Sequence, residues 1–276
     1  KLYDLGINRI SIEQKIDNLS ESKLSIWLTY SEWSENDLDL LIENLRPLTK
    51  QFGLELPSYN WVKIKDEDWS ISWKKDWKPD PVGNEFLILP AWLDVPHDQS
   101  NRVVIRLDPG SAFGTGSHPT TRLCLEAIEK IPLSGKKLAD LGCGSGILSL
   151  AAIKKGSEKV FAVDIDSLAV RSTIENRRLN NIDKDLLQVE LGSIEVLELI
   201  LNKHPVDFLI CNTLAPVIEK LAPNFGKVVS KTGKVFLSGL LMDQYLSLEK
   251  ILLSFGWKVN NLEKKDSWGL ICISRK

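Results

Sequence analysis

The stretch Leu138-Ala139-Asp140-Leu141-Gly142-Cys143-Gly144-Ser145-Gly146 decides the fold of this chain. Apolar residues run into a glycine-rich turn, and the next segment, Ile147-Leu148-Ser149-Leu150-Ala151-Ala152-Ile153, has the composition of a buried helix. A strand, a tight turn and a helix in this order are typical of one unit of a parallel β-sheet. We therefore expect an α/β fold with a doubly wound sheet and a small ligand on the glycine turn.

The charges around this turn distinguish between two classes of ligand. A dinucleotide-binding fingerprint needs a third glycine at its sixth position and holds pyrophosphate on N–H groups at the helix N-terminus. Here the sixth position is Ile147, and the carboxylate of Asp140 would repel a pyrophosphate. S-adenosylmethionine carries a sulfonium and an ammonium group, which Asp140 would attract, while Gly142 and Gly144 let the backbone approach. The pattern favours this methyl donor.

Asp164 supports the same cofactor. It ends a second apolar run about twenty residues after the glycines, where a carboxylate can accept hydrogen bonds from both ribose hydroxyls. The alternative role for such a residue is to cap a helix. Asp166 fits that role better, because helical spacing begins immediately after it. We assign Asp164 to the cofactor and Asp166 to the cap.

Composition limits the classes of protein that fit. With 276 residues, 43% hydrophobic and 26% charged, the chain can bury a large core. It contains neither a membrane-spanning run nor a signal segment, so we expect a cytoplasmic protein without a membrane partner. The net charge is −2 and basic runs are two residues long, which argues against direct sequence-specific nucleic-acid binding. The four cysteines are widely spaced, so we expect reduced thiols and no metal.

Three segments follow one another along the chain. Residues 1–60 predict a small α+β recognition domain, and Lys1–Gly6 resembles the end of a helix, so the numbering is expected to begin inside the native chain. Residues 61–80 predict a linker helix, on which tryptophans spaced four apart either dock the helix or bind a partner, and we favour docking. Residues 81–276 predict the cofactor-binding domain.

Within the first segment we expect three strands and one helix. The strands are predicted near residues 9–12, 24–30 and 52–56. The helix is predicted to begin at Ser34, with a capping box formed with Asp37, and to stop before Pro47.

Two further stretches of the second domain carry candidate site residues. Asp108 to Thr121 contains three glycines before a helix that begins near Pro119, and His118 in this stretch is either functional or an ordinary capping or packing residue. Asn212 follows a strand whose carboxyl end lies at the ligand-binding edge of such a sheet. It is either a turn residue or the acceptor that aims an amine at the methyl carbon, and its position favours the second role. The last two apolar runs, 257–259 and 269–273, predict an antiparallel edge.

These stretches resemble the PrmA family, the methyltransferases that modify ribosomal protein L-11 in bacteria and organelles. The resemblance begins near Trp61 and is carried by the following stretches: Asp108 to Thr121, Asp140 to Gly146, Val163-Asp164-Ile165-Asp166, Cys211-Asn212-Thr213-Leu214-Ala215, and Ser238-Gly239-Leu240-Leu241 with Gln244. It implies a seven-stranded class I methyltransferase (Rossmann-like) domain joined by the linker helix to a ferredoxin-like domain that binds the substrate. The family usually has isoleucine where Thr213 stands.

The resemblance also implies site residues and a reaction. The expected cofactor-binding residues are Phe113, Gly114, Thr115, Thr121, Asp140, Gly142, Gly144, Asp164 and Asn212, and Asn212 is also the expected catalytic residue. The implied reaction transfers methyl groups from S-adenosylmethionine to lysine side chains and an α-amino group of ribosomal protein L-11, with S-adenosylhomocysteine as product. We expect a monomer. The alternatives are an acceptor that is RNA, another protein or a small molecule, a nicotinamide oxidoreductase, and a non-catalytic binding module.

Overall fold

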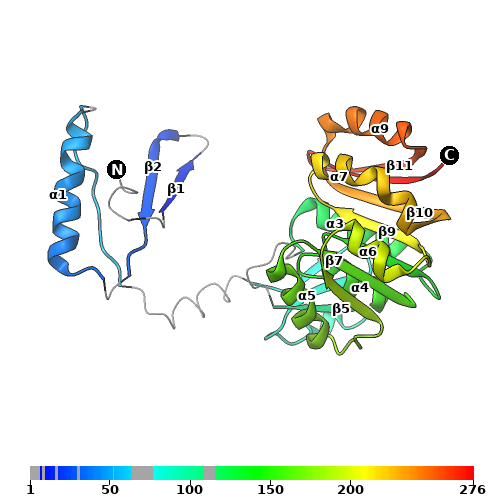
Figure 1. Ribbon diagram of the computed structural model, residues 1–276. Helices are drawn as coiled ribbons and strands as arrows, with labels where there is room; N and C mark the ends of the chain where they lie inside the picture. The colour runs from blue at the N-terminus through cyan, green and yellow to red at the C-terminus, as the bar shows by residue number, and fades with distance from the viewer. Residues whose placement is uncertain are drawn as a thin grey trace. The chain divides into compact units, whose positions relative to one another are not determined.

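The computed structural model describes residues 7, 10–15, 18–29, 32–51, 53–63, 77–108 and 116–276. The chain divides into two compact units, Lys1–Lys74 and Lys75–Lys276, and Figure 1 shows the elements of each. Each unit is described by itself below.

The first unit contains a hairpin and a helix. Strands β1 (Ile10–Lys15) and β2 (Asn18–Ile26) pair antiparallel. Helix α1 (Glu35–Gln51) buries Leu41 and Ile42. The predicted capping box is confirmed, because the Asp37 carboxylate accepts from Ser34 N at 2.8 Å and Ser34 Oγ accepts from Asp37 N at 3.3 Å. The ferredoxin-like arrangement stays a prediction.

Three boundaries in this unit differ from the sequence-based expectations. β2 ends at Ile26, so residues 27–29 lie outside the strand predicted for 24–30. The helix does not stop before Pro47 but continues to Gln51 despite the hydrogen bond that proline removes. The strand predicted near 52–56 is wrong over its described residues, 53–56. Gly53 instead has φ 69° and ends α1, with its N–H donating to Lys50 O at 3.0 Å.

The predicted linker helix lies mostly outside the described residues, which exclude 64–76 and with them Trp69 and Trp73. The described ends of the segment, 61–63 and 77–79, are not helical, and strand β3 begins at Asp80. The linker helix therefore stays a prediction for the intervening residues.

The second unit is built on a seven-stranded sheet, and its strand order confirms the predicted doubly wound fold. The strands are β6 (Lys137–Leu141), β7 (Lys159–Asp164), β8 (Leu187–Leu191), β9 (Val206–Asn212), β10 (Val229–Leu241), β11 (Trp257–Lys265) and β12 (Trp268–Arg275). They lie in the order β11-β12-β10-β9-β6-β7-β8. β12 is antiparallel to both of its neighbours. The predicted antiparallel pair exists, although β12 lies inside the sheet and β11 forms the edge.

Alternate residues of each strand enter two separate cores, as the two-residue period of a strand requires. Leu138 and Ile210 belong to one core, whereas Ala139 and Leu209 belong to the other. The first core is closed by α3 (Pro119–Lys130) and α4 (Ile147–Lys154), and α5 (Ser167–Leu179) packs beside β7 and β8. The second is closed by α6 (Ile194–Leu201), α7 (Ala215–Leu221), α8 (Phe225–Val228) and α9 (Tyr245–Ser254). Figure 1 shows these helices around the sheet.

A small sheet joins the first core. Strands β3 (Asp80–Val82), β4 (Phe86–Pro90) and β5 (Val103–Leu107) form it, and β4 is buried along its whole length. Phe86 and Ile105 pack in the same cluster as residues of α3 and α4. Arg122 of α3 pairs with Asp80 at 2.7 Å, which fastens the start of this sheet to the helix.

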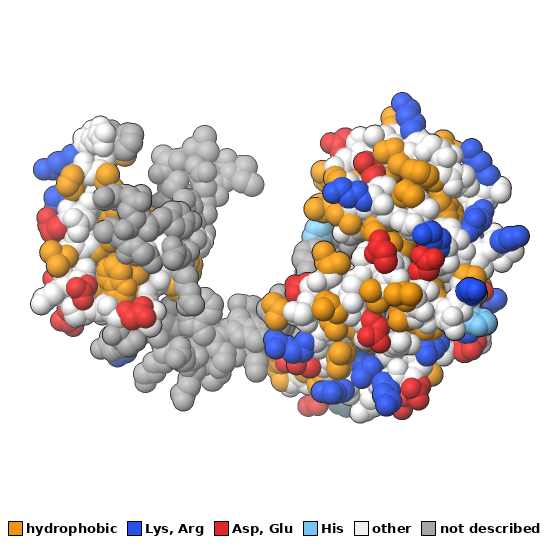
Figure 2. All heavy atoms as spheres, viewed as in Figure 1, with side chains coloured by type: hydrophobic (Ala, Val, Ile, Leu, Met, Phe, Trp, Pro, Cys, Tyr) orange, Lys and Arg blue, Asp and Glu red, His pale blue; other side chains and the backbone are white. Residues whose placement is uncertain are grey.

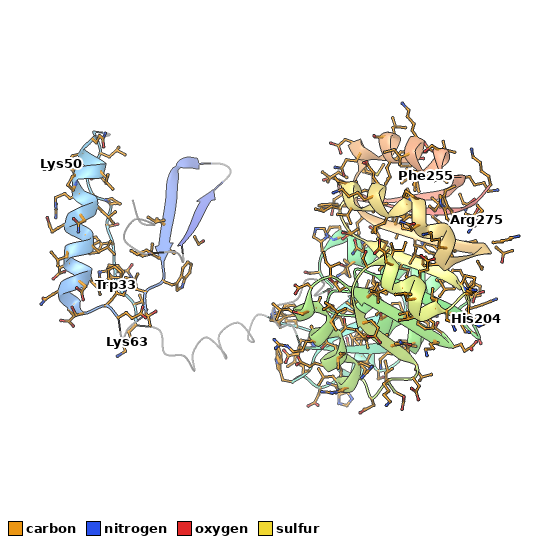
Figure 3. All side chains as sticks on the ribbon, in the orientation of Figure 1. Trp33, Lys50, Lys63, His204, Phe255 and Arg275 are labelled. Atoms are coloured by element: carbon orange, nitrogen blue, oxygen red, sulfur yellow. The ribbon has the colours of Figure 1, made fainter. Side chains whose placement is uncertain are left out.

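The C-terminal strand is anchored at the opposite end from the site described below. Arg275, labelled in Figure 3, places its guanidinium 5.5 Å from the centre of the Trp257 ring and donates to Gly226 O. Trp257 is 2% exposed and stacks edge-on against Phe225. These contacts hold β11, β12 and α8 together.

Candidate cofactor and acceptor site

The site lies where the chain order of the strands reverses. β6 has β7 on one side and β9 on the other, and all three are parallel. Open α/β sheets bind ligands in the crevice beyond the carboxyl ends of such strands. Leu141 pairs with Val163, and Asp140 pairs with Ile210. Gly142, which follows β6, therefore lies at about the same level as Asp164 and Asn212, the last residues of β7 and β9.

The glycine turn between β6 and α4 is hydrogen-bonded to β7. Val163 O accepts from Gly142 N at 2.9 Å and from Cys143 N at 3.1 Å. Gly142 has φ 83°, which favours glycine, and a Cβ added there would meet no atom within 4 Å. No atom of the described residues therefore lies close to the side of Gly142 where a side chain would be.

Asp164 connects the turn to its own strand end. Its Oδ2 accepts from Gly144 N at 2.9 Å, and its Oδ1 accepts from Asp166 N at 3.0 Å. The side chain is half-buried. A carboxylate has about four lone-pair positions, so each oxygen retains capacity for a ligand hydroxyl. Asp166 caps α5 by accepting from Leu168 N at 2.8 Å, which confirms the predicted cap.

Asp140 is buried at 1% exposure beneath the turn. Its Oδ2 accepts from Ser149 Oγ at 2.6 Å and from Ser149 N at 3.1 Å, which ties β6 to α4. Burial raises the pKa of Asp140 to about 6, against the lowering effect of the Ser149 hydroxyl. Its Oδ1 is buried with no hydrogen-bond partner among the described residues. Because this oxygen is buried, it would act on a positively charged ligand through its charge rather than by direct contact.

Asn212 at the end of β9 contacts Thr121 of α3. Asn212 Nδ2 donates to Thr121 Oγ1 at 3.4 Å, and Thr121 lies in the first turn of α3 at 1% exposure. Pro119 begins α3 as predicted. His118 caps this helix, with Nδ1 2.8 Å from Thr120 Oγ1, and packs against Trp268 with ring centres 4.9 Å apart. The structure thus supports the capping and packing role for His118.

A bulge in β10 shapes the chain after Asn212. The pairing register of β10 shifts between Ser238 and Leu240, and Gly239 there has φ 85°. Thr213 N donates to Ser238 O at 3.0 Å. A Cβ on Gly239 would lie 2.3 Å from Thr213 O, so only glycine allows this approach. Leu214, which follows Thr213, is 63% exposed.

Several predicted features are tested only in part. Phe113, Gly114 and Thr115, assigned to the cofactor, lie outside the described residues. All four cysteines are free and buried, as expected. Burial raises the pKa of the Cys143 and Cys211 thiols far above the usual range.

Among the described residues, we find no group of three or more His, Cys, Asp or Glu side chains placed to hold a metal. No helix in this part of the chain is long and apolar enough to cross a membrane.

Comparison with known proteins identifies the family. The sequence profile of "Ribosomal protein L11 methyltransferase (PrmA)" matches residues 8–276. The chain belongs to the PrmA family. A "Ribosomal protein L11 methyltransferase" from Prochlorococcus marinus (strain MIT 9313) is 52% identical over all of this chain and 91% of its own length. One from Parasynechococcus marenigrum (strain WH8102) is also 52% identical, over 96% of its length.

A solved structure agrees with this placement. The ribosomal protein L11 methylase from Lactobacillus delbrueckii subsp. bulgaricus superimposes with a TM-score of 0.64 at 30% identity. The match covers 72% of this chain and 100% of that one. Family and fold are those of a class I S-adenosylmethionine-dependent methyltransferase, as the resemblance to the PrmA family implied.

The residues present in this PrmA chain fit the methyl donor. No described atom lies within 4 Å of a Cβ at Gly142, and Asp164 can accept further hydrogen bonds. The unpartnered Oδ1 of Asp140 adds negative electrostatic potential near the turn. A positively charged ligand with vicinal hydroxyls matches this set.

Sequence analysis missed the polar face of α5. Thr173 and Asn176 are buried at 0% and 1% exposure, where an amphipathic helix usually places apolar residues. Both hydrogen-bond to the glycine turn. The sequence could have indicated this face, because Thr173, Asn176 and Asn180 are spaced three and four residues apart. In a helix this spacing places them on the face that carries Ala169.

Proposed function

We propose that this chain transfers methyl groups from S-adenosylmethionine to amines of ribosomal protein L11, namely lysine side chains and the α-amino group. The observation that carries the proposal is the convergence of Gly142, Asp164 and Asn212 on one edge of the sheet in a chain of the PrmA family. The names of the relatives support the choice of acceptor.

The cofactor half of the site comprises the turn and the two carboxylates. Asp164 would accept the ribose hydroxyls, Gly142 and Gly144 would allow close backbone approach, and Asp140 would stabilise the positive charge from beneath. When bound, S-adenosylmethionine supplies a methyl group that its sulfonium charge has already activated. Thr121 of α3 would close this half from the side of Asn212.

The acceptor half has to present a neutral amine. A lysine with a pKa near ~10.4 is almost fully protonated at neutral pH, and removing water from its surroundings lowers that pKa. Asn212 Oδ1 would accept from the amine and aim its lone pair at the methyl carbon. In such a transfer the C–N bond would form as the S–C bond breaks, sulfur would keep the electron pair, and the methylated ammonium would later release a proton. Positioning and desolvation then supply most of the rate.

Intact-mass spectrometry tests the proposal. Purified ribosomal protein L11 is incubated with S-adenosylmethionine and this protein, beside the Asn212→Ala variant. We expect methyl-sized mass increments with the wild-type chain and a strong reduction with the variant.

The same experiment separates the alternatives. No increment, with S-adenosylmethionine binding shown by calorimetry, would mean that the acceptor is another protein, an RNA or a small molecule. Retention of a nicotinamide nucleotide in place of S-adenosylmethionine would contradict the assignment of the cofactor.

The monomeric state, the cytoplasmic location, and the absence of a metal, a membrane partner and a nucleic-acid partner stay predictions. Figure 2 shows basic and acidic side chains interspersed on the visible face of the second unit, which fits a protein substrate better than a nucleic acid.

A further inference from the structure

The polar face of α5 contacts the glycine turn at two successive carbonyl groups. Thr173 Oγ1 donates to Gly144 O at 2.9 Å, and Asn176 Nδ2 donates to Ser145 O at 2.9 Å. Asn180, one turn further along, bonds instead to both backbone groups of Arg106 in β5. Thr173 therefore bonds to the turn and Asn180 to the small sheet, whereas Asn176 bonds to both, because its Oδ1 also accepts from Asp108 N at 2.9 Å just after β5.

Gly144 is held at both of its backbone groups. Its carbonyl accepts from Thr173, and its N–H donates to Asp164 Oδ2 at 2.9 Å. The two groups belong to adjacent peptide planes that meet at the Gly144 Cα. The bond to Thr173 fixes the plane after this atom and, because the turn holds Gly144 at φ 55°, restrains the plane that carries the N–H. Thr173 thus acts on the Asp164 carboxylate through one intervening residue.

The packing around Thr173 leaves it little freedom. A Cβ on Gly146 would lie 2.7 Å from Thr173 Cγ2 and 2.9 Å from its Oγ1, so helix and turn approach as closely as glycine permits. The hydroxyl also lies 3.4 Å from Cys143 Sγ. The side chain is 0% exposed and cannot turn toward solvent.

We propose that Thr173 is a positioning residue that sets the orientation of Asp164 toward the ribose hydroxyls through Gly144. The inference rests on the proposed cofactor site, because it gives Asp164 the ribose as ligand. A role in packing alone would make Thr173 important for stability and irrelevant to how the ribose is recognised.

The test compares two ligands. Calorimetry gives the affinity of the full chain for S-adenosylhomocysteine and for its 2′,3′-dideoxy analogue, and the ratio of the two reports the hydrogen bonds to Asp164. Two hydrogen bonds to a charged group predict a ratio of about 100-fold or more in the wild type. Thr173→Val, which replaces the hydroxyl with a methyl group, is expected to reduce the ratio to about 10-fold or less. Thr173→Ser keeps the hydroxyl and is expected to restore the wild-type ratio.

Asn180→Ala is the matched control, because it removes side-chain hydrogen bonds from the same helix face without touching the turn. We expect a lower melting temperature and an unchanged ratio. If Thr173→Val fails to fold, Thr173→Ala replaces it with the same expectation.

Three outcomes would overturn the inference, and each contradicts a different claim: the role of Thr173, the ribose contact of Asp164, or the proposed function. A wild-type ratio in a folded Thr173→Val or Thr173→Ala variant contradicts the role of Thr173 alone. A wild-type chain that binds S-adenosylhomocysteine and its dideoxy analogue equally contradicts the ribose contact of Asp164, on which the inference depends. A wild-type chain that binds neither contradicts the proposed function itself.

Discussion

The two halves of the site are built differently. In the cofactor half, β7, Asp164 and α5 all hydrogen-bond to the glycine turn, through Val163 O, Asp164 Oδ2 and Thr173 Oγ1. In the acceptor half, the Asn212 carboxamide makes a 3.4 Å bond to Thr121, and Leu214 beside it is largely exposed. Among the described residues, the proposed cofactor half is therefore held by more hydrogen bonds than the proposed acceptor half. This difference suits an enzyme that binds an invariant donor and presents several amines of one protein to it.

Removing the Asp164 carboxylate is expected to have the largest effect on this comparison. Asp164→Ala loses both ribose acceptors and releases Gly144 N, so affinity for S-adenosylmethionine should fall by about 1,000-fold, from two charge-assisted hydrogen bonds. Calorimetry measures the loss. Asp166→Ala, the neighbouring acid that caps α5, is the control and should lower stability by about 1 kcal/mol without changing affinity. Equal affinity losses in both variants would contradict a special role for Asp164.

Asn212→Ala tests the other half. Turnover should fall by about 100-fold because the amine is no longer aimed, while the dissociation constant of S-adenosylmethionine changes by much less. Steady-state kinetics with L11, together with calorimetry, separate the two quantities. Thr213→Ile, a change to the residue usual in the family, should leave both unchanged. Unchanged turnover in Asn212→Ala would remove this residue from the mechanism.

Asp140→Asn probes the charge beneath the cofactor half. The folded pKa of Asp140 is raised to about 6 from 3.8, so the folded chain holds a proton that the unfolded chain releases between these values. Wild-type stability from this group therefore decreases as pH rises through that window, by roughly 2 kcal/mol between pH 4 and pH 7. Asn does not titrate, so the stability of the variant lacks this pH dependence. The free energy of unfolding is measured with urea at pH 4 and at pH 7. From the lower to the higher pH, the variant should become more stable relative to wild type by that amount. A difference that does not change with pH would contradict the raised pKa.

Gly142→Ala gives the smallest expected effect. The methyl group enters the open space where the ligand lies and is attached at φ 83°. Obstruction of the ligand predicts about a 10-fold loss of affinity for S-adenosylmethionine, and the backbone strain lowers stability. Gly135→Ala, at φ 67° with similarly open surroundings but in the loop before β6, should lower stability equally and leave affinity unchanged. Equal affinities for wild type and Gly142→Ala would show that the ligand does not approach this position.

Sequence patterns predicted the centre of the sheet in the second unit because β6, β7 and β9 are buried apolar runs followed by Gly142 or ending at Asp164 and Asn212. They were less accurate in the first unit. Phe52 to Leu56 alternates like a strand, but Gly53 ends the preceding helix there, and local spacing does not show which of the two will form. The role of Thr173 was missed because its partner lies 29 residues away, on a different element.

The buried cysteines give each half of the site its own chemical reporter. Cys143 belongs to the glycine turn, and Cys211 directly precedes Asn212. Because both thiols are buried and their pKa values are raised, a thiol reagent reacts with either one only after local opening. Labelling rates read by peptide mass spectrometry would therefore time the opening of each half separately. A bound donor should slow the reaction at Cys143, and a bound acceptor protein should slow it at Cys211.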